Sequence, residues 1–297
     1  MVNKSALRTS GGMGMCNNHV VVASQNGPVT LHRRDVVRGL WAGSMVAFTG
    51  ASVSGCSTNP ATGRSQIAFM SDSQLVSMAS QAWADTKNEL PISKDRNANQ
   101  RLTRIGEKIR VVASERTPSL ANADWEFVVF DTDDKNAFVL PGGKVGFYKG
   151  LLDYSDNDDQ VAAVLGHEVG HVEGRHSNER MSQQTLGQVG LVATGLAATM
   201  SDLSAEQQQM VMMGASAGLT LGIILPFSRT HELEADKLGV DSMYNAGYDP
   251  REAVNLWVKM GQNSSGAPPE WMSTHPSPET RVRELTNYIN AKGYALM

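Results

Sequence analysis

Cysteine is nearly absent from this sequence of 297 residues: there are two, Cys16 and Cys56, and none follows Cys56. The chain beyond residue 56 therefore has no disulfide framework and no metal site built on thiolates. A metal bound there would have to be held by histidine, aspartate or glutamate. The chain has seven histidines, few enough for each to be considered singly.

A basic excess is also missing. The formal net charge is −4, from 26 Lys and Arg against 30 Asp and Glu. Proteins that bind nucleic acid usually carry a basic surplus or a basic stripe, so we expect no nucleic-acid partner. The length suits one large domain or two small ones.

Long hydrophobic runs are lacking too. Two glycine- and alanine-rich stretches, 186–200 and 210–226, are apolar and almost free of charge. The second has about 17 residues, which is the lower limit for a helix that crosses a bilayer. We therefore expect buried or membrane-facing helices in both stretches rather than true spans.

Residues 1–56 have the features of an export signal. The stretch from Met1 to about Thr30 is polar and shows no periodicity, so we expect no structure there. Arg33-Arg34 then precede a weakly apolar run, Gly39–Val53, which is too short to span a bilayer comfortably. Paired arginines before such a run are typical of the twin-arginine export route.

The end of this segment, Val53-Ser54-Gly55-Cys56, resembles the lipobox of bacterial lipoproteins, in which the cysteine receives a diacylglyceryl group and becomes the N-terminus. We therefore expect a periplasmic protein held to a membrane by a lipid on Cys56, with 57–70 as a tether and 71–297 as the folded domain. Ser57-Thr58 stand where an aspartate would favour the inner membrane, so the outer membrane is favoured. A buried N-terminal helix with an incidental cysteine is the alternative.

Helical periodicity dominates the rest of the chain. Ser71 or Asp72, Asp249-Pro250 and Ser277-Pro278 are good helix starts. We expect a mostly helical α+β domain with one small sheet beside the helix that begins near Asp158. The expected helices are one after residue 71 and others over 95–115, 158–180, 231–245, 250–262 and 278–291, and the expected strands are 125–130 and a hairpin of 137–140 and 144–148.

The helix expected from Asp158 contains His167-Glu168-Val169-Gly170-His171. Residues four apart lie on one face of a helix, so both imidazoles can bind one zinc ion. Glu168 lies beside them, where it can act as the general base. A five-residue match also arises by chance, so it needs support from further ligands.

A catalytic zinc takes three protein ligands and keeps one position open. Further along the chain, His231-Glu232-Leu233-Glu234-Ala235-Asp236 supplies candidates. Glu232 is the preferred third ligand, because Asp236 lies one turn on and can fix the tautomer of a ligand imidazole by accepting its hydrogen bond. Glu234 and His231 compete for this role, but neither has a carboxylate four residues further on.

A third histidine shortly after His171 would indicate a metzincin. Gly174-Arg175-His176 does contain a histidine, but without the intervening pattern of that group. A remote glutamate, Glu232, makes the arrangement that of a gluzincin.

Several pieces of the chain, taken in order, resemble peptidase family M48, the group of HtpX-like, prenyl-CAAX and mitochondrial Oma proteases. The resemblance covers about Cys56 to Arg281 and implies a gluzincin-type metallopeptidase domain with one zinc ion per chain. Several bacterial members are periplasmic lipoproteins. The integral-membrane members have clear spans, whereas the corresponding region of this chain is only weakly apolar. The pieces are Asn59–Arg64, Asn136–Gly143, His167–His171, Glu232–Asp236, and Thr274-His275-Pro276 with Arg281.

For the reaction, we expect zinc on His167, His171 and Glu232 to activate a water molecule whose proton Glu168 takes. The oxyanion needs a further electrophile, for which His275 is the candidate, with Arg281 as its support or as a positioning charge. His275 has two alternatives: a loop histidine that caps a helix, and a plug that occupies the open zinc position.

The strand 137–140 is a candidate sheet edge that could hold an extended peptide by strand addition, although an ordinary paired strand is equally expected. The sequence thus predicts an envelope endopeptidase that cleaves unfolded or misassembled polypeptides, and an oligomer is compatible with it. The alternative is an envelope chaperone or assembly factor whose zinc is mainly structural.

Overall fold

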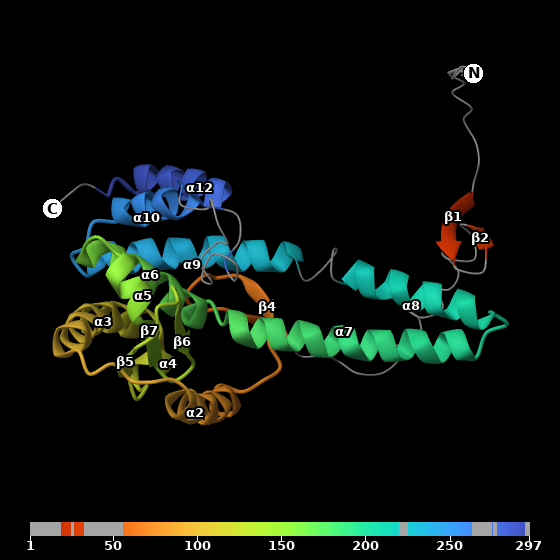
Figure 1. Ribbon diagram of the computed structural model, residues 1–297, viewed down its shortest axis with the longest axis horizontal. Helices are drawn as coiled ribbons and strands as arrows, with labels where there is room; N and C mark the ends of the chain where they lie inside the picture. Colours follow the sequence, from red (N-terminus) through yellow and green to blue (C-terminus); the bar gives the residue numbers. More distant parts are fainter. Residues whose placement is uncertain are drawn as a thin grey trace, which may run out of the picture. The chain divides into compact units, whose positions relative to one another are not determined.

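The computed structural model describes residues 19–24, 27–32, 56–219, 225–262, 275 and 278–294. Most of these residues are helical and the strands are short, so the mostly helical α+β class is confirmed (Figure 1). The chain divides into two compact units. The larger unit comprises Ser52–Gly187 and Ala217–Met297, and the smaller unit comprises Met1–Ala51 and Gln188–Ser216.

A three-stranded sheet lies in the larger unit. Its strands are β5 (Glu126–Phe130), β6 (Ala137–Leu140) and β7 (Lys144–Tyr148), in the order β5-β7-β6. β7 pairs parallel with β5 and antiparallel with β6, which confirms the hairpin. Gly142 and Gly143 form its turn with φ of 90° and 82°, a conformation that glycine adopts at no steric cost. β6 is an edge of this sheet.

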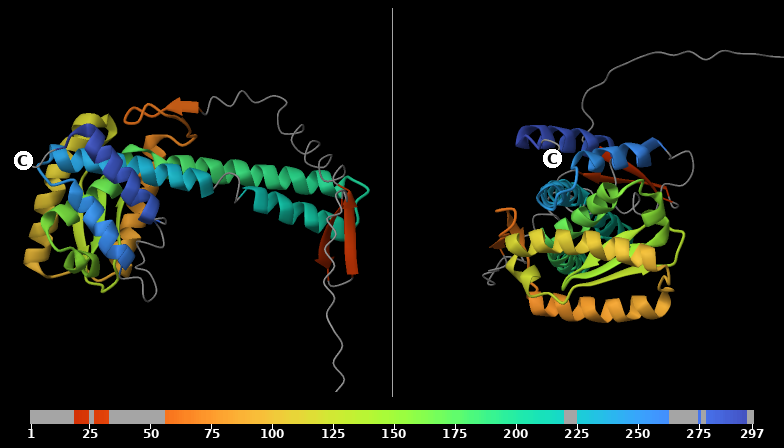
Figure 2. Two further views of the ribbon diagram at one scale, coloured as in Figure 1. Left: turned by 90° about the horizontal axis from the view of Figure 1, so that it is seen from above. Right: turned by 90° about the vertical axis from the view of Figure 1, so that its left-hand side faces the viewer.

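Alternating side chains give the sheet two apolar faces. One face packs against α2 (Asp72–Glu89), where Trp83 meets the rings of Phe130 and Phe138. The other face lies on the main core, which it shares with α3 (Arg96–Arg116) and α6 (Asp158–Glu173). α2 and α6 thus lie on opposite faces of the sheet (Figure 2).

The remaining helices of the larger unit complete its core. They are α4 (Pro118–Ala121), α5 (Lys149–Tyr154), α9 (Leu225–Asn245), α10 (Arg251–Gln262) and α12 (Pro278–Lys292). α10 packs against α12. α10 also contacts α6, and α12 contacts α9.

The start of α2 follows the sequence prediction, because the Ser71 hydroxyl accepts from Gln74 N while the Gln74 side chain accepts from Ser71 N.

The helices α6 and α9 approach each other more closely than any side chain would allow. A Cβ atom built on Gly239 would lie 2.8 Å from the backbone nitrogen of His167, and one on Gly170 would lie 2.7 Å from the carbonyl oxygen of Ala235. Real Cβ atoms do not come so near to backbone atoms. Glycine at these positions therefore lets α6 and α9 touch backbone to backbone.

The helix expected over 158–180 is two helices in the structure. α6 ends at Glu173, and α7 (His176–Thr199) begins after Arg175, whose φ is 54°. A left-handed residue cannot continue an α-helix. Gly174 permits the bend because the imidazole of His176 would lie 2.3 Å from a Cβ atom there.

A hairpin occupies part of the segment expected to be a tether. β3 (Cys56–Thr58) pairs with β4 (Ser65–Ile67). Asn59, in the loop between the two strands, and Gln66, within β4, have buried side chains. Buried amides need hydrogen-bond partners, and both side chains find them on residues 173 and 174. Residues 57–67 therefore fold onto the larger unit.

The smaller unit holds a second hairpin, of β1 (His19–Ser24) and β2 (Gly27–His32), where we expected no structure. Val20, Val21, Val22 and Val29 lie in these strands, and β-branched residues favour strand structure, which the polar composition of the segment as a whole does not indicate. The apolar stretches 186–200 and 210–226 fall largely in α7 and α8 (Ala205–Leu219). The signal features expected over 33–55 lie outside the described residues. Among the described helices, none has both the length and the apolar character of a membrane span.

The contact between α6 and α9 predicts that Gly239→Ala destabilises the protein. Alanine is the better helix former by about 1 kcal/mol, yet the new methyl group must displace backbone, and such overpacking costs about 1–3 kcal/mol. We expect a lower midpoint in urea denaturation followed by circular dichroism. Gly261→Ala in α10 is the control, since nothing lies within 4 Å of its Cβ position, and its midpoint should not fall. Equal midpoints for both variants would contradict the close contact.

Candidate metal centre

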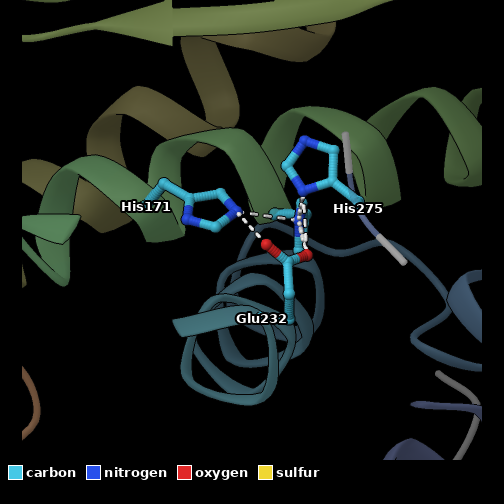
Figure 3. Close-up of side chains that lie close together, drawn as sticks. His171, Glu232 and His275 are labelled. Carbon is cyan, nitrogen blue, oxygen red and sulfur yellow. Dashed lines mark hydrogen bonds and ion pairs between the residues drawn. The ribbon is translucent and has the colours of Figure 1, made fainter. Parts of the chain in front are cut away.

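The predicted zinc ligands come together at the crossing of α6 and α9. His167 Nε2 lies 3.0 Å from His171 Nε2, and the Glu232 carboxylate lies 3.4 Å from the first and 3.6 Å from the second. Figure 3 shows Glu232 pointing from α9 toward the imidazole of His171. The two histidines project from one face of α6, four residues apart. One ion could therefore bind all three side chains.

His275 is the fourth member of the cluster. Its Nδ1 lies 2.8 Å from Glu232 Oε2 and 3.3 Å from His167 Nε2. One atom from each of His167, His171, Glu232 and His275 falls within 4.8 Å of the others. His275 thus lies among the ligands, where either an electrophile or a plug would be found.

The donor set fits a zinc ion. Two imidazoles and a carboxylate are ligands that zinc binds in catalytic sites. Glu232 Oε1 is buried and accepts no hydrogen bond from the described residues, although a buried carboxylate oxygen normally has a partner. The Glu232 side chain is only 3% exposed. A cation at this position would supply the missing partner.

Glu168 follows the first ligand directly on α6 and is also buried. Its carboxylate lies 3.5 Å from His275 Nε2, so it faces the same space as the ligands. It is placed where a carboxylate can exchange protons with a group in the cluster without occupying a ligand position.

Asp236 contacts the imidazole of His167. His167 Nδ1 lies 2.9 Å from Asp236 Oδ1, so a neutral His167 donates there and keeps Nε2 for a metal. Burial alone would raise the pKa of the Asp236 carboxyl, but the charge and hydrogen bonds of Arg281 hold that pKa below its ordinary value. Asp236 therefore stays ionised as an acceptor.

Arg281 reaches this carboxylate from α12. Its guanidinium donates to Asp236 Oδ2 at 2.7 Å, lies 3.1 Å from Glu232 Oε2, and stacks 3.6 Å from the ring centre of Trp257. The side chain is 1% exposed. This position fits the positioning charge of the sequence prediction better than a group that touches a substrate.

His171 has a comparable arrangement that the sequence analysis missed. His171 Nδ1 lies 2.8 Å from His176 Nδ1, and His176 Nε2 lies 3.1 Å from Glu234 Oε2. Burial lowers the pKa of His176 to about 4, so it is neutral near pH 7. Glu234, a competitor for the third ligand position, thus lies behind the site. The other competitor, His231, bonds to Glu179 at 2.9 Å.

A cavity of about 50 Å³ opens beside His171. Apolar side chains of α2, α4 and α6 line it, together with the β6–β7 turn. Arg175 and Asn178 are among its polar lining residues. A side chain of a bound peptide could lie here, next to a metal ligand.

Comparison with known proteins gives a consistent result. The model of peptidase family M48 matches residues 97–289. The chain is 36% identical to the mitochondrial metalloendopeptidase OMA1 of Schizosaccharomyces pombe over 172 residues, which are 57% of this chain and 48% of that protein. It is 31% identical to the beta-barrel assembly-enhancing protease of Yersinia pestis over 236 residues, 78% of this chain and 47% of that protein. The chain spans about half the length of these relatives.

The bond from His167 to Asp236 predicts a metal-affinity defect in Asp236→Asn. An amide can turn its NH₂ toward His167 and favour the wrong tautomer, and losing such a partner typically weakens metal binding by about 10–100-fold. Zinc affinity is measured by competition with a chromophoric chelator. Asp241→Asn is the control, because Asp241 lies on the same helix but bonds to Tyr288 and Tyr294. Unchanged affinity in Asp236→Asn would rule out this role.

Proposed function

The chain belongs to peptidase family M48, and from that premise we propose that it is a zinc-dependent endopeptidase of the bacterial cell envelope. The observation that carries the proposal is the cluster itself: three ligand side chains from α6 and α9 with Glu168 beside them. A structural zinc site usually has four ligands of its own and no base. Three ligands and a base are the composition of a hydrolytic site.

Zinc held by His167, His171 and Glu232 would supply a Lewis acid that polarises the peptide carbonyl and acidifies the attacking water. Glu168 takes the proton of that water and then delivers it to the nitrogen of the leaving amine. Asp236 holds His167 in the tautomer that leaves Nε2 available. Arg281 keeps Asp236 ionised and its orientation fixed.

Polypeptides are the proposed substrates. β6 is an edge strand of its sheet and packs against α6, which holds two of the ligands. An extended peptide can add to such an edge through backbone hydrogen bonds, which select for unfolded chain more than for side-chain identity. This supports the cleavage of unfolded or misassembled proteins.

The proposed location is the periplasm, with a lipid on Cys56 as the anchor and the outer membrane as the favoured one. Two observations support it: the lipobox-like Val53-Ser54-Gly55-Cys56, and the similarity to the beta-barrel assembly-enhancing proteases of Yersinia pestis and Escherichia coli. The second candidate function is an envelope chaperone or assembly factor, which His275 favours by standing among the ligands.

Glu168→Gln should abolish cleavage while the zinc content stays at one per chain, because the amide cannot accept a proton but leaves the ligands untouched. Casein cleavage and metal content are measured on the same preparation. The parent should also lose activity to a chelator and regain it with added zinc. Casein cleavage by Glu168→Gln at the parent's rate would remove Glu168 from the mechanism, and a fully metallated but inactive parent would favour the chaperone.

His275→Ala should raise casein cleavage several-fold. With His275 the cluster offers four donors, and four ligands close a zinc site, so we propose that His275 is a plug in this conformation. Initial rates at equal zinc content test this. A variant that binds zinc fully but loses activity would show instead that His275 is an electrophile.

A further inference from the structure

The segment just after Cys56 contacts the metal centre through a chain of side chains. We propose that His176, Glu234 and Arg64 are positioning residues for the metal ligand His171, and that the loop Asn59–Gln66 is thereby a functional part of the metal centre. The inference rests on the proposed zinc site. It assigns a role to Asn59–Arg64, a motif that the proposed reaction does not use.

The hydrogen bonds of this chain run in one direction. If His171 binds metal through Nε2, its Nδ1 carries the proton and donates to His176 Nδ1, 2.8 Å away. His176 then carries its own proton on Nε2, which donates to Glu234 Oε2 at 3.1 Å. Glu234 Oε1 accepts from Arg64 Nε at 2.7 Å. Each step fixes the tautomer or orientation required by the step before it.

Arg64 is the last residue of this hydrogen-bond chain, and its positive charge pairs with two carboxylates. Besides Glu234, it makes a two-pronged pair with Glu179, at 2.9 and 2.6 Å. Planar guanidinium groups fix the carboxylates that they bind in this way. His167 and His171 are thus supported alike. The hydrogen bonds from the Nδ1 atom of each imidazole lead to a carboxylate that an arginine binds: Arg281 in the case of His167, and Arg64 in the case of His171.

The loop that carries Arg64 is held in one conformation by its own hydrogen bonds. Asn59 Oδ1 accepts from the backbone nitrogens of Ala61 and Thr62, at 2.7 and 3.1 Å. Gly63 has a φ of 70°, which turns the chain back. Asn59 N donates to the carbonyl oxygen of Arg64 at 2.8 Å. These bonds leave the Arg64 backbone little freedom.

The same loop caps the end of the ligand helix. The last carbonyls of a helix have no partner within it. Asn59 Nδ2 donates to the carbonyl oxygen of Glu173 at 3.0 Å, and Gln66 Nε2 donates to that of Gly174. Glu173 is the last residue of α6, and Gly174 lies in the bend between His171 and His176. The loop therefore fixes both the bend and Arg64, the last residue of the hydrogen-bond chain that starts at His171.

A merely stabilising ion pair would have the same burial, so the test needs a matched control. Arg116 supplies it: it pairs with Glu173 at the end of α6 as Arg64 pairs with Glu179. The arginine side chains are 23% exposed in both pairs, and the glutamates 0% and 1%. Within the part of the chain that the structure describes, the side chains of Arg116 and Glu173 bond to each other, to Leu238 O, and to the hydroxyls of Ser242 and Thr117, and none of these bonds leads to a ligand imidazole.

The experiment measures zinc affinity by chelator competition and the visible absorption of the Co²⁺-loaded protein. Its samples are the full chain and the variants Arg64→Gln, Glu234→Gln and Arg116→Gln. Removing such a partner typically weakens metal binding by about 10–100-fold, so we expect about a tenfold loss in the first two variants and a changed Co²⁺ spectrum. Arg116→Gln should lower the thermal midpoint but leave affinity and spectrum unchanged.

The double variant Arg64→Gln/Glu234→Gln tests whether Arg64 acts on His171 through Glu234. Residues that act through one another are not additive, so we expect the double variant to bind zinc about as well as Glu234→Gln alone. Glu234→Gln keeps the shape and one acceptor, so it serves where Arg64→Gln fails to fold. Parent-like affinity and spectrum in Glu234→Gln would overturn the inference, as would equal losses in Arg116→Gln. A parent that binds no zinc would overturn the proposed metal site itself.

Discussion

The backbone contact between α6 and α9 is the constraint on which the rest of the site depends. Two ligands come from α6 and one from α9, and their donor atoms must lie close enough to share an ion. Packed helices usually keep their axes about 8–10 Å apart because side chains separate them. Gly170 and Gly239 remove that separation where the ligands lie. Glycine lowers the stability of each helix slightly, but without it the two helices could not cross at this distance.

Buried charge is the second constraint. Glu232 and Asp236 are both buried acids on adjacent turns of α9, and buried carboxylates are unstable unless they are paired. Arg281 contacts both of them, and the face of Trp257 covers its guanidinium. Removing Arg281 would take a cationic partner away from both carboxylates at once. The helix α12, far from α6 in the sequence, thus contributes through Arg281 to the charge balance around the ligands.

What could be read from the sequence was local. His167, Glu168 and His171 share one helix, as do Glu232 and Asp236, so helical spacing alone placed each set. The chain from His171 to Arg64 was missed because it joins three segments, and a bend at Gly174 brings His176 back toward His171. No spacing rule reports such a contact. The expected tether differed for the same reason: residues 57–67 look polar and turn-prone, but the amides of Asn59 and Gln66 have partners at the end of α6 and just beyond it.

The position of Asn59 limits how far the larger unit can stand from its anchor. Asn59 is fully buried only three residues after Cys56, and extended chain spans at most about 3.3–3.6 Å per residue. With Cys56 acylated as proposed, about 11 Å of backbone would separate the lipid-bearing residue from folded protein. A linker this short would keep the folded unit next to the membrane that holds Cys56. The unit would then act at the bilayer surface, on polypeptides that are located there.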